Sequence, residues 1–331
     1  MSLMTTISML DLVENAPTER DAYRYLEDLR WADTPICAHC GSERVFFLNP
    51  ANQRSRKTRT GAHSERRVWK CGACRKQFSV LTNTVMHGTK IPVRTWLFVI
   101  FEMIANKNGV SAREIQRRYK LTPKSAWFLL HRIREAMDND GPTNMMRGTI
   151  VADEAHIGGS LRNMHRSRIK SEPVVAGTSF PHGSNKTAVL SLIDTEMGEA
   201  RSKVVPDVTG ATLRKVIAEQ VDMGGSTLHT DESSSYRPFA HEFLAHLTVD
   251  HKAGEYVRNG ASTNKAENFF SQLKRSLDGT HHHVSRKHLP RYLVEFDFRY
   301  STRKLSDTAR MLLLMGRLDG TRLSYRPLTD E

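Results

Sequence analysis

Apolar residues recur at helical spacing from Pro92 onward, which predicts a helix packed on one face. The apolar positions of that face are Trp96, Val99, Ile100, Met103 and Ile104. Ser111 and Glu114 then form an S-x-x-E capping box, which predicts the start of a short helix.

A second helix is expected after a turn. Thr122 is a good N-cap and Pro123 suits the first helical position, so the helix should run to about Met137. Residues 91–140 are therefore expected to form a helix-turn-helix segment. An ordinary helical hairpin with charged outer faces is the alternative.

The pattern changes to alternating strands and helices beyond residue 147. An apolar strand over residues 149–152 is expected to end in carboxylates and a glycine turn, and residues 186–193 and 200–205 predict a hairpin. Thr209 should cap a helix over residues 211–221, and residues 226–230 should form a parallel strand. Strand, hairpin, helix, strand and helix in this order predict an α/β fold with a mixed sheet.

Charge is concentrated in one part of the chain. The net charge is +13, and residues 54–134 carry 19 Lys and Arg against three acids, so this block holds +16 and the remainder −3. A basic block of this size favours a polyanion such as nucleic acid, with a merely solvated surface as the alternative. The longest apolar run has six residues, far below the roughly 18 that a membrane span needs. Together with the polar N-terminus, this predicts a cytoplasmic protein with no membrane partner.

The four cysteines form two C-x-x-C pairs, Cys37 with Cys40 and Cys71 with Cys74. Two such pairs can place four thiolates around one Zn²⁺ ion, so a structural zinc is expected. Strands at residues 45–47 and 68–70 would complete a zinc ribbon over residues 31–90. A disulfide or a redox pair is the weaker interpretation, and His39 and His63 are the rival ligands.

Three carboxylates lie on separate predicted elements. Asp153 and Asp231 each follow a predicted strand, and Glu267 lies on a predicted helix whose one face also carries Asn264, Ser271 and Lys274. Such a set can converge to hold two Mg²⁺ or Mn²⁺ ions for attack on a phosphodiester. Each acid alone is equally well explained as a surface carboxylate.

The order and spacing of these residues resemble the DDE transposases of bacterial insertion sequences that carry an N-terminal zinc ribbon. The likeness covers roughly residues 30–305. It rests on the four cysteines, Asp153-Glu-Ala-His-Ile-Gly-Gly, His229-Thr-Asp231, Thr263-Asn-Lys-Ala-Glu267, Leu273-Lys-Arg275, the segment 282–292 and Glu295-Phe-Asp-Phe-Arg-Tyr300.

The resemblance implies a ribonuclease H-like catalytic domain over residues 147–305, with Asp153, Asp231 and Glu267 as metal ligands. Lys274 would touch DNA beside the cleaved phosphate. Some relatives have asparagine at the third acidic position, so Asn264 would assist or replace Glu267. The chain departs from its relatives at Ser301, where asparagine is usual, and an effect on packing or DNA contact is expected.

The remaining segments complete the expected organisation: an N-terminal helical segment at 1–30 and a C-terminal tail at 306–331. Double-stranded DNA is the expected partner, and the resemblance implies a homo-oligomer on paired ends. The expected DNA-contacting residues are Arg54, Arg56, Lys57, Arg59, Lys124, Ser125, Arg132, Arg134 and Arg275. Residues 161–184 are interpreted as a basic loop, with plain disorder as the alternative.

Several nearby residues are expected to lie outside the catalytic chemistry. Glu154 should point to the opposite face of its strand from Asp153. His156 and His229 are expected to pack or to form hydrogen bonds. The run from His281 to His283 chelates one ion poorly because consecutive side chains point in different directions, and the resemblance favours a structural or DNA-end role.

The leading hypothesis is a transposase that binds terminal inverted repeats, cleaves the 3′ ends and joins them to target DNA in a metal-dependent reaction. One alternative is a sequence-specific DNA-binding regulator on an inactive transposase scaffold. The other is a metal-dependent nuclease that hydrolyses DNA without joining it.

Overall fold

The computed structural model of the chain describes residues 7–32, 34–48, 65–138, 144–158, 186–249, 263–320 and 322–329. It divides into two compact units. The first unit comprises residues 1–137 together with 304–331, and the second comprises residues 138–303. In the parts of the chain just given, no helix has both the length and the apolar character needed to cross a membrane.

The helices of the first unit surround α3, which is buried on nearly every side. Its side chains from residue 96 to residue 104 are all buried, so it is a central helix and not the one-sided helix that the spacing predicted. Helices α1, α2, α5 and α10 all pack against α3. The bounds are α1 Met9–Asn15, α2 Glu19–Trp31, α3 Val93–Ala105, α4 Ala112–Arg118, α5 Pro123–Met137, α10 Asp307–Gly316 and α11 Arg326–Thr329.

The C-terminal segment is not the simple tail that was expected. Helix α10 packs on α2 and α3, and its side chains Met311 and Leu314 are completely buried. The backbone N–H of Ile7 donates to the Thr308 hydroxyl at 2.6 Å, which links the two ends of the first unit. The apolar run at 311–315 carries the helical spacing that indicates this burial.

A small three-stranded antiparallel sheet forms the ribbon, in the order β1, β2, β3. The strands are β1 Val45–Phe47, β2 Trp69–Cys71 and β3 Gln77–Phe78. The first strand is where the sequence predicts it, the second begins one residue later, and the third was not predicted. Phe47 pairs with Trp69 in the β1–β2 ladder.

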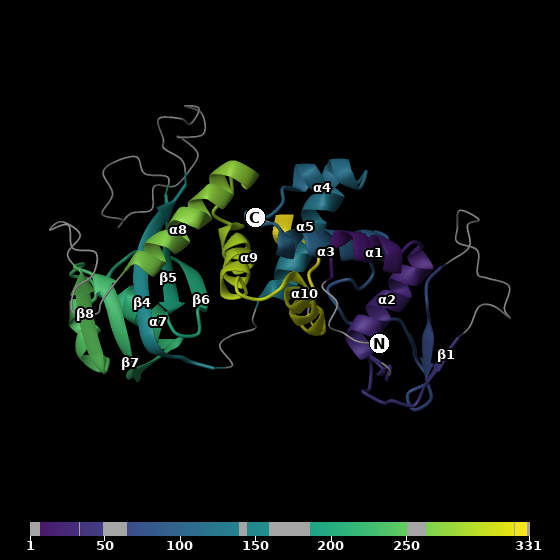
Figure 1. Ribbon diagram of the computed structural model, residues 1–331. Helices are drawn as coiled ribbons and strands as arrows, with labels where there is room; N and C mark the ends of the chain where they lie inside the picture. Colours follow the sequence, from purple (N-terminus) through teal and green to yellow (C-terminus); the bar gives the residue numbers. More distant parts are fainter. Residues whose placement is uncertain are drawn as a thin grey trace. The chain divides into compact units, whose positions relative to one another are not determined.

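The second unit is built on a five-stranded mixed sheet (Figure 1). Its order is β6, β5, β4, β7, β8; β4, β5 and β6 are antiparallel neighbours, while β7 runs parallel to β4 and β8 parallel to β7. This mixed topology confirms the expected ribonuclease H-like α/β fold. The strands are β4 Met146–Ile157, β5 Thr187–Asp194, β6 Ala200–Val205, β7 Val221–Asp231 and β8 Ala245–Val249.

Helices cover both faces of this sheet (Figure 1). On one face, α7 (Gly210–Ala218) and the short helix η3 (Arg237–Glu242) enclose a cluster that includes Ile150 and Leu228. On the other face, α8 (Asn264–Ser276) and α9 (Leu289–Ser301) enclose a cluster that includes Val151 and Phe269. The short helix η5 (Leu277–His281) continues α8.

Two predicted boundaries in this unit differ from the structure. Strand β4 continues through Asp153 to Ile157, because residues 153–157 pair with β5, so Asp153 lies inside a strand and not at its end. Helix α7 ends at Ala218, three residues before its predicted end, and β7 begins at Val221. Asp231 is the last residue of β7, as predicted.

Candidate functional site

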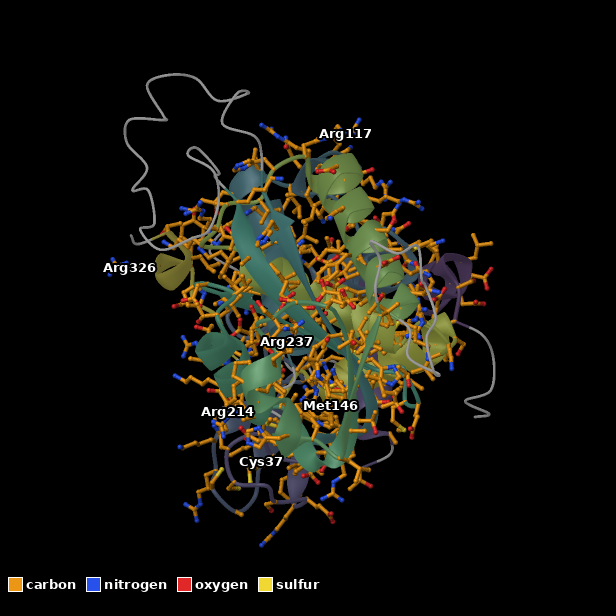
Figure 2. The ribbon with its side chains drawn as sticks, turned by 90° about the vertical axis from the view of Figure 1, so that its left-hand side faces the viewer. Cys37, Arg117, Met146, Arg214, Arg237 and Arg326 are labelled. Carbon is orange, nitrogen blue, oxygen red and sulfur yellow. The ribbon has the colours of Figure 1, made fainter. Side chains whose placement is uncertain are left out.

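The four cysteines converge as the sequence predicts. Their sulfur atoms all lie within 4.8 Å of one another, with 3.7 Å between Cys37 and Cys74 and 3.6 Å between Cys40 and Cys71. Backbone N–H groups of Cys74 and Ala73 donate to the Cys71 sulfur and lower the pKa of its thiol to about 6, which favours the thiolate that a metal binds. Cys37 is labelled in Figure 2. Four sulfurs at this spacing fit a tetrahedral structural zinc, and the cysteines are free of disulfides.

A buried carboxylate holds the ribbon against helix α2. Glu27 accepts hydrogen bonds from the Arg67 guanidinium at 2.6 Å and from the Trp69 indole at 2.8 Å. Burial raises the pKa of Glu27, and the two donors oppose that rise. Arg67 also stacks over Phe47 of β1 at 4.3 Å. The sheet next to the four cysteines is therefore bonded to helix α2, which precedes the predicted ribbon.

Of the two rival zinc ligands, the structure describes only His39, and its side chain does not enter this site. His39 Nε2 lies 3.3 Å from the backbone oxygen of Gln77, and His39 is not part of the four-sulfur group. His63 lies outside the described residues. The basic segment that was expected to contact DNA also lies outside them, and its members are Arg54, Arg56, Lys57 and Arg59.

The two helices expected in the helix-turn-helix segment are present as α4 and α5, joined by a short turn. The capping box is formed, because the Ser111 hydroxyl accepts from the Glu114 N–H while the Glu114 carboxylate accepts from the Ser111 N–H. A buried acid of α3 holds α4 in place: Glu102 accepts from Arg118 at 2.5 Å and from the Tyr119 hydroxyl at 2.7 Å. Arg117, labelled in Figure 2, is exposed on α4.

The N-terminal turn of α5 carries the two residues that were expected to read bases. Lys124 is exposed, and the Thr122 hydroxyl accepts from the Ser125 N–H at 3.1 Å, as an N-cap should. Two side chains near the start of α5 contact Tyr325 of the C-terminal segment. The Lys124 ammonium lies 4.1 Å from the centre of the Tyr325 ring, and the centre of the Trp127 ring lies 6.2 Å from the same point. Sequence reasoning did not find this contact, because the two partners are about 200 residues apart.

Arg132 and Arg134 are in different surroundings from those expected. Both side chains are buried, with exposed fractions of 6% and 1%. Arg132 donates to the backbone oxygen of His87 at 2.7 Å and stacks over Trp96 and Phe128. Burial lowers its pKa to about 10. The expected phosphate contacts of these two arginines do not fit the structure, because their α5 face packs into the core of the first unit.

Asp153 and Asp231 lie on neighbouring parallel strands at the same level. In the β4–β7 ladder Val151 pairs with His229, and each aspartate stands two residues further along its own strand. Side chains alternate between faces with a period of two, so both aspartates project from the face that carries Val151. That is the face that α8 and α9 cover.

Helix α8 brings Glu267 to this face of the sheet. The helix packs against β4 and β5, and Ala266, the residue before Glu267, is buried in the same cluster as Val151 and Ala155. Those two residues flank Asp153 on its own side of β4. Glu267 lies in the first turn of α8, exposed at the edge of its buried face.

The other α8 residues singled out by the sequence are also exposed. They are Asn264 at the start of the helix and Lys274 and Arg275 in its last turn. Within the described residues, the four cysteines are the group of three or more metal-binding side chains with a spacing that suits one ion. The three carboxylates are not gathered to that spacing.

Glu154 points away from Asp153, as predicted, and has a specific partner. The hydroxyl of Tyr236 donates to its carboxylate at 2.5 Å. Burial raises the pKa of Glu154 to about 7, the Tyr236 hydrogen bond opposes this rise, and the charges of Asp153 and Asp231 add to it. Asp153 and Asp231 therefore lie close enough to Glu154 to disfavour its charged form. No motif in the sequence marks Tyr236 as a partner of Glu154, although it closes the serine-rich turn after Asp231.

The histidines near these acids are partly buried within the second unit. Burial lowers the pKa of both His156 and His229, and nearby lysines lower that of His156 further. His281 packs edge-on against the Tyr292 ring at 4.8 Å. Ser301, the departure from the related sequences, accepts a hydrogen bond from the Ala200 N–H at 3.0 Å and so serves packing between α9 and β6.

Comparison with known proteins matches two parts of the chain to family descriptions. Residues 17–77 match the transposase zinc-ribbon domain, and residues 145–301 match the ISXO2-like transposase domain. No curated protein matches the chain.

Among solved structures, the chain is similar to one described as a cryoEM structure of the simian T-cell lymphotropic virus intasome in complex with the PP2A regulatory subunit B56 gamma. The sequence identity is 14% and the TM-score is 0.27. The match covers 55% of this chain and 63% of that one.

The two family matches follow each other in the order that the sequence predicts, and together they include all four cysteines and the three carboxylates. The first match contains the four-sulfur cluster, and the second contains the mixed sheet with Asp153 and Asp231 at one level. The chain therefore belongs to the zinc-ribbon DDE transposases, with an ISXO2-like transposase domain.

Proposed function

We propose that this protein binds the terminal inverted repeats of its own element, cleaves the 3′ ends and joins them to target DNA. The observation that carries the proposal is the placement of the carboxylates. Asp153 and Asp231 stand side by side on β4 and β7, and Glu267 lies on the helix that covers the same face. This face belongs to a domain of the transposase family.

The donor set supports a divalent metal site. Carboxylate oxygens are ligands that Mg²⁺ and Mn²⁺ prefer, and the repulsion that Asp153 and Asp231 exert on Glu154 would be relieved by a cation. Asp153, Asp231 and Glu267 would hold the ions, with Asn264 as an auxiliary ligand. Divalent ions held by these residues would supply activation of the attacking hydroxyl and stabilisation of the leaving oxygen.

The chain's own side chains would position DNA around that site. Lys274 and Arg275 form an exposed basic turn at the end of α8, seven and eight residues beyond Glu267, and can bind the phosphates next to the scissile bond. In the first unit, Lys124 and Ser125 would contact the terminal repeat together with the basic segment between the cysteine pairs. That segment comprises Arg54, Arg56, Lys57 and Arg59.

Two further expectations belong to the same proposal. Two transposon ends must be held together during joining, so the active form would be a homo-oligomer on paired DNA ends. A protein that acts on bacterial DNA would work in the cytoplasm, in association with the nucleoid.

The proposal is tested by incubating the zinc-loaded protein with DNA that carries the terminal repeats and with a target plasmid, in the presence of Mg²⁺ or Mn²⁺. We expect nicked 3′ ends and joined products from the wild type. Asp153→Ala, Asp231→Ala and Glu267→Ala should each reduce both products by at least about a thousandfold, since the lost ligands support the chemical step.

Glu242→Ala is the matched control, because Glu242 is an acid of the same unit that pairs with Arg214 on the surface. It should cleave and join like the wild type. Nicking without joined products would support the nuclease alternative, and specific binding without any cleavage would support the regulator.

A further inference from the structure

A hydrogen bond connects strand β4 with the turn that follows strand β7, on the face of the sheet opposite to the aspartates. Glu154 follows Asp153 in β4. Tyr236 ends the turn that begins directly after Asp231. The Tyr236 hydroxyl donates to the Glu154 carboxylate at 2.5 Å, so the residue after Asp153 is bonded to a residue five positions beyond Asp231, on the opposite face of the sheet.

Tyr236 is held rigidly where it makes this bond. Its side chain is completely buried within the cluster that α7 and η3 cover. Its ring lies 6.0 Å from that of Phe239 and 6.4 Å from that of His246. A tyrosine fixed by packing on several sides can impose its position on the acid that it binds.

Short backbone contacts carry this restraint to the aspartates themselves. The backbone N–H of Glu154 donates to Asp153 Oδ1 at 2.8 Å. The backbone N–H of Ser233, in the turn that leads to Tyr236, donates to Asp231 Oδ1 at 3.0 Å. The bond between Tyr236 and Glu154 therefore closes a path from one aspartate to the other.

We propose that Tyr236 and Glu154 form a clasp that fixes the spacing of Asp153 and Asp231 and thereby sets the affinity of the site for divalent cations. Both are positioning residues, since they act through the aspartates. The inference rests on the proposed function, because it assumes that these aspartates bind metal.

The test compares Tyr236→Phe with the wild type. The variant keeps the buried ring and loses only the donor. With the ribbon loaded with zinc, Mn²⁺ binding to the full-length protein is titrated by electron paramagnetic resonance. We expect binding about tenfold weaker, the size of effect seen when an outer partner of a metal ligand is lost. The Mn²⁺ concentration for half-maximal cleavage should rise equally, while the rate at saturating Mn²⁺ changes less than about twofold.

The matched control is Tyr300→Phe. Tyr300 is a buried tyrosine of the same unit, and its ring packs on Phe269 in the cluster on the other face of the sheet. It should bind Mn²⁺ as the wild type does. If the loss of any buried tyrosine hydroxyl weakened Mn²⁺ binding, both Tyr236→Phe and Tyr300→Phe would bind Mn²⁺ more weakly than the wild type.

Variants of Glu154 test the same hydrogen bond independently, in case Tyr236→Phe does not fold. Glu154→Gln retains an acceptor for the tyrosine and should stay within about threefold of the wild type, whereas Glu154→Leu should match Tyr236→Phe. The double variant of Tyr236→Phe with Glu154→Leu should also be about tenfold weaker, and not a hundredfold, because each change breaks the same bond. Additive losses would overturn the clasp.

The failure of the proposed function can be told apart from that of the clasp. If Asp153→Ala binds Mn²⁺ like the wild type, the proposed metal site is wrong. If Asp153→Ala loses Mn²⁺ while Tyr236→Phe and Glu154→Leu both bind it normally, the metal site stands and the clasp is wrong.

Discussion

Each cysteine of the ribbon contributes one sulfur to a four-sulfur cluster, so losing any one leaves an incomplete metal site. We predict that Cys40→Ser lowers the zinc content of the purified protein from about one ion per chain to well below half, as measured by elemental analysis. His39→Ala is the control and should keep its zinc, because His39 contacts a backbone oxygen of β3. Zinc loss in His39→Ala would restore the rival histidine ligand.

Asp297 on α9 is a half-buried acid whose ionisation should oppose folding. It accepts hydrogen bonds from the N–H and the hydroxyl of Ser202, and burial raises its pKa from 3.8 to about 8. Lys203 lowers this value and Asp138 raises it. Because the folded pKa exceeds the unfolded one, the stabilisation is fully present below pH 4 and is lost as the pH rises through about 8.

We therefore predict that the free energy of unfolding of the wild type falls relative to that of Asp297→Asn between pH 5.5 and 8.5. The slope should be up to about 1.4 kcal/mol per pH unit below pH 8. Urea unfolding at several pH values measures it. Parallel pH profiles for the two proteins would show that Asp297 does not titrate in this range.

Single residues differ in how far the sequence reveals their surroundings. The cysteine ligands were predictable because two C-x-x-C pairs in one short segment are typical of a structural zinc site. Arg132 was assigned to DNA because charge alone favours an exposed position, but its side chain crosses the aromatic rings of the core. Glu154 was placed on the correct face by strand alternation, whereas its partner Tyr236 depends on a turn that alternation does not describe.

Among the elements, helix α2 and the ribbon are joined by the carboxylate of Glu27. We predict that Glu27→Ala lowers the free energy of unfolding of the first unit by about 3 kcal/mol, because Arg67 and the Trp69 indole lose their buried acceptor. Urea unfolding followed by tryptophan fluorescence measures this loss.

Glu14→Ala, at an exposed position of α1, is the control and should change stability by less than about 0.5 kcal/mol. The zinc content of Glu27→Ala should stay that of the wild type, since all four sulfurs remain. An unchanged stability would show that the carboxylate does not anchor the ribbon.

The elements that were predicted correctly are those with a strong local pattern. Helices α4 and α5 were indicated by their capping residues, and β6 by the turn before it, which marks the second strand of a hairpin. Strand β8 has only five residues, and it forms by pairing with β7, which is a contact distant in sequence. The extension of β4 past Asp153 likewise depends on pairing with β5, which local propensity does not reveal.

At the scale of the whole molecule, the first unit is assembled from both ends of the chain. We predict that removal of residues 304–331 lowers the melting temperature of the first unit by at least about 10 °C, because α3 and α2 lose the buried side chains of α10. The second unit should keep its own transition. Differential scanning calorimetry of the wild type and of the truncated protein measures the unfolding transition of each unit.

Leu314→Ala tests the same contact with the chain at full length. Leu314 is completely buried, so the substitution should cost the first unit about 3 kcal/mol and leave the second unchanged. If neither the truncation nor Leu314→Ala lowers the stability of the first unit, α10 does not contribute to its core and the C-terminal segment is a simple tail.

The division of the chain has a consequence for the order in which the protein is made. Residues 138–303 are inserted between the two parts of the first unit, so a ribosome releases the whole catalytic sequence before α10 emerges. The unit with the ribbon can therefore be completed only after the whole second unit has been synthesised. A polypeptide cut short within residues 138–303 would lack α10, and its first unit would be left with an incomplete core.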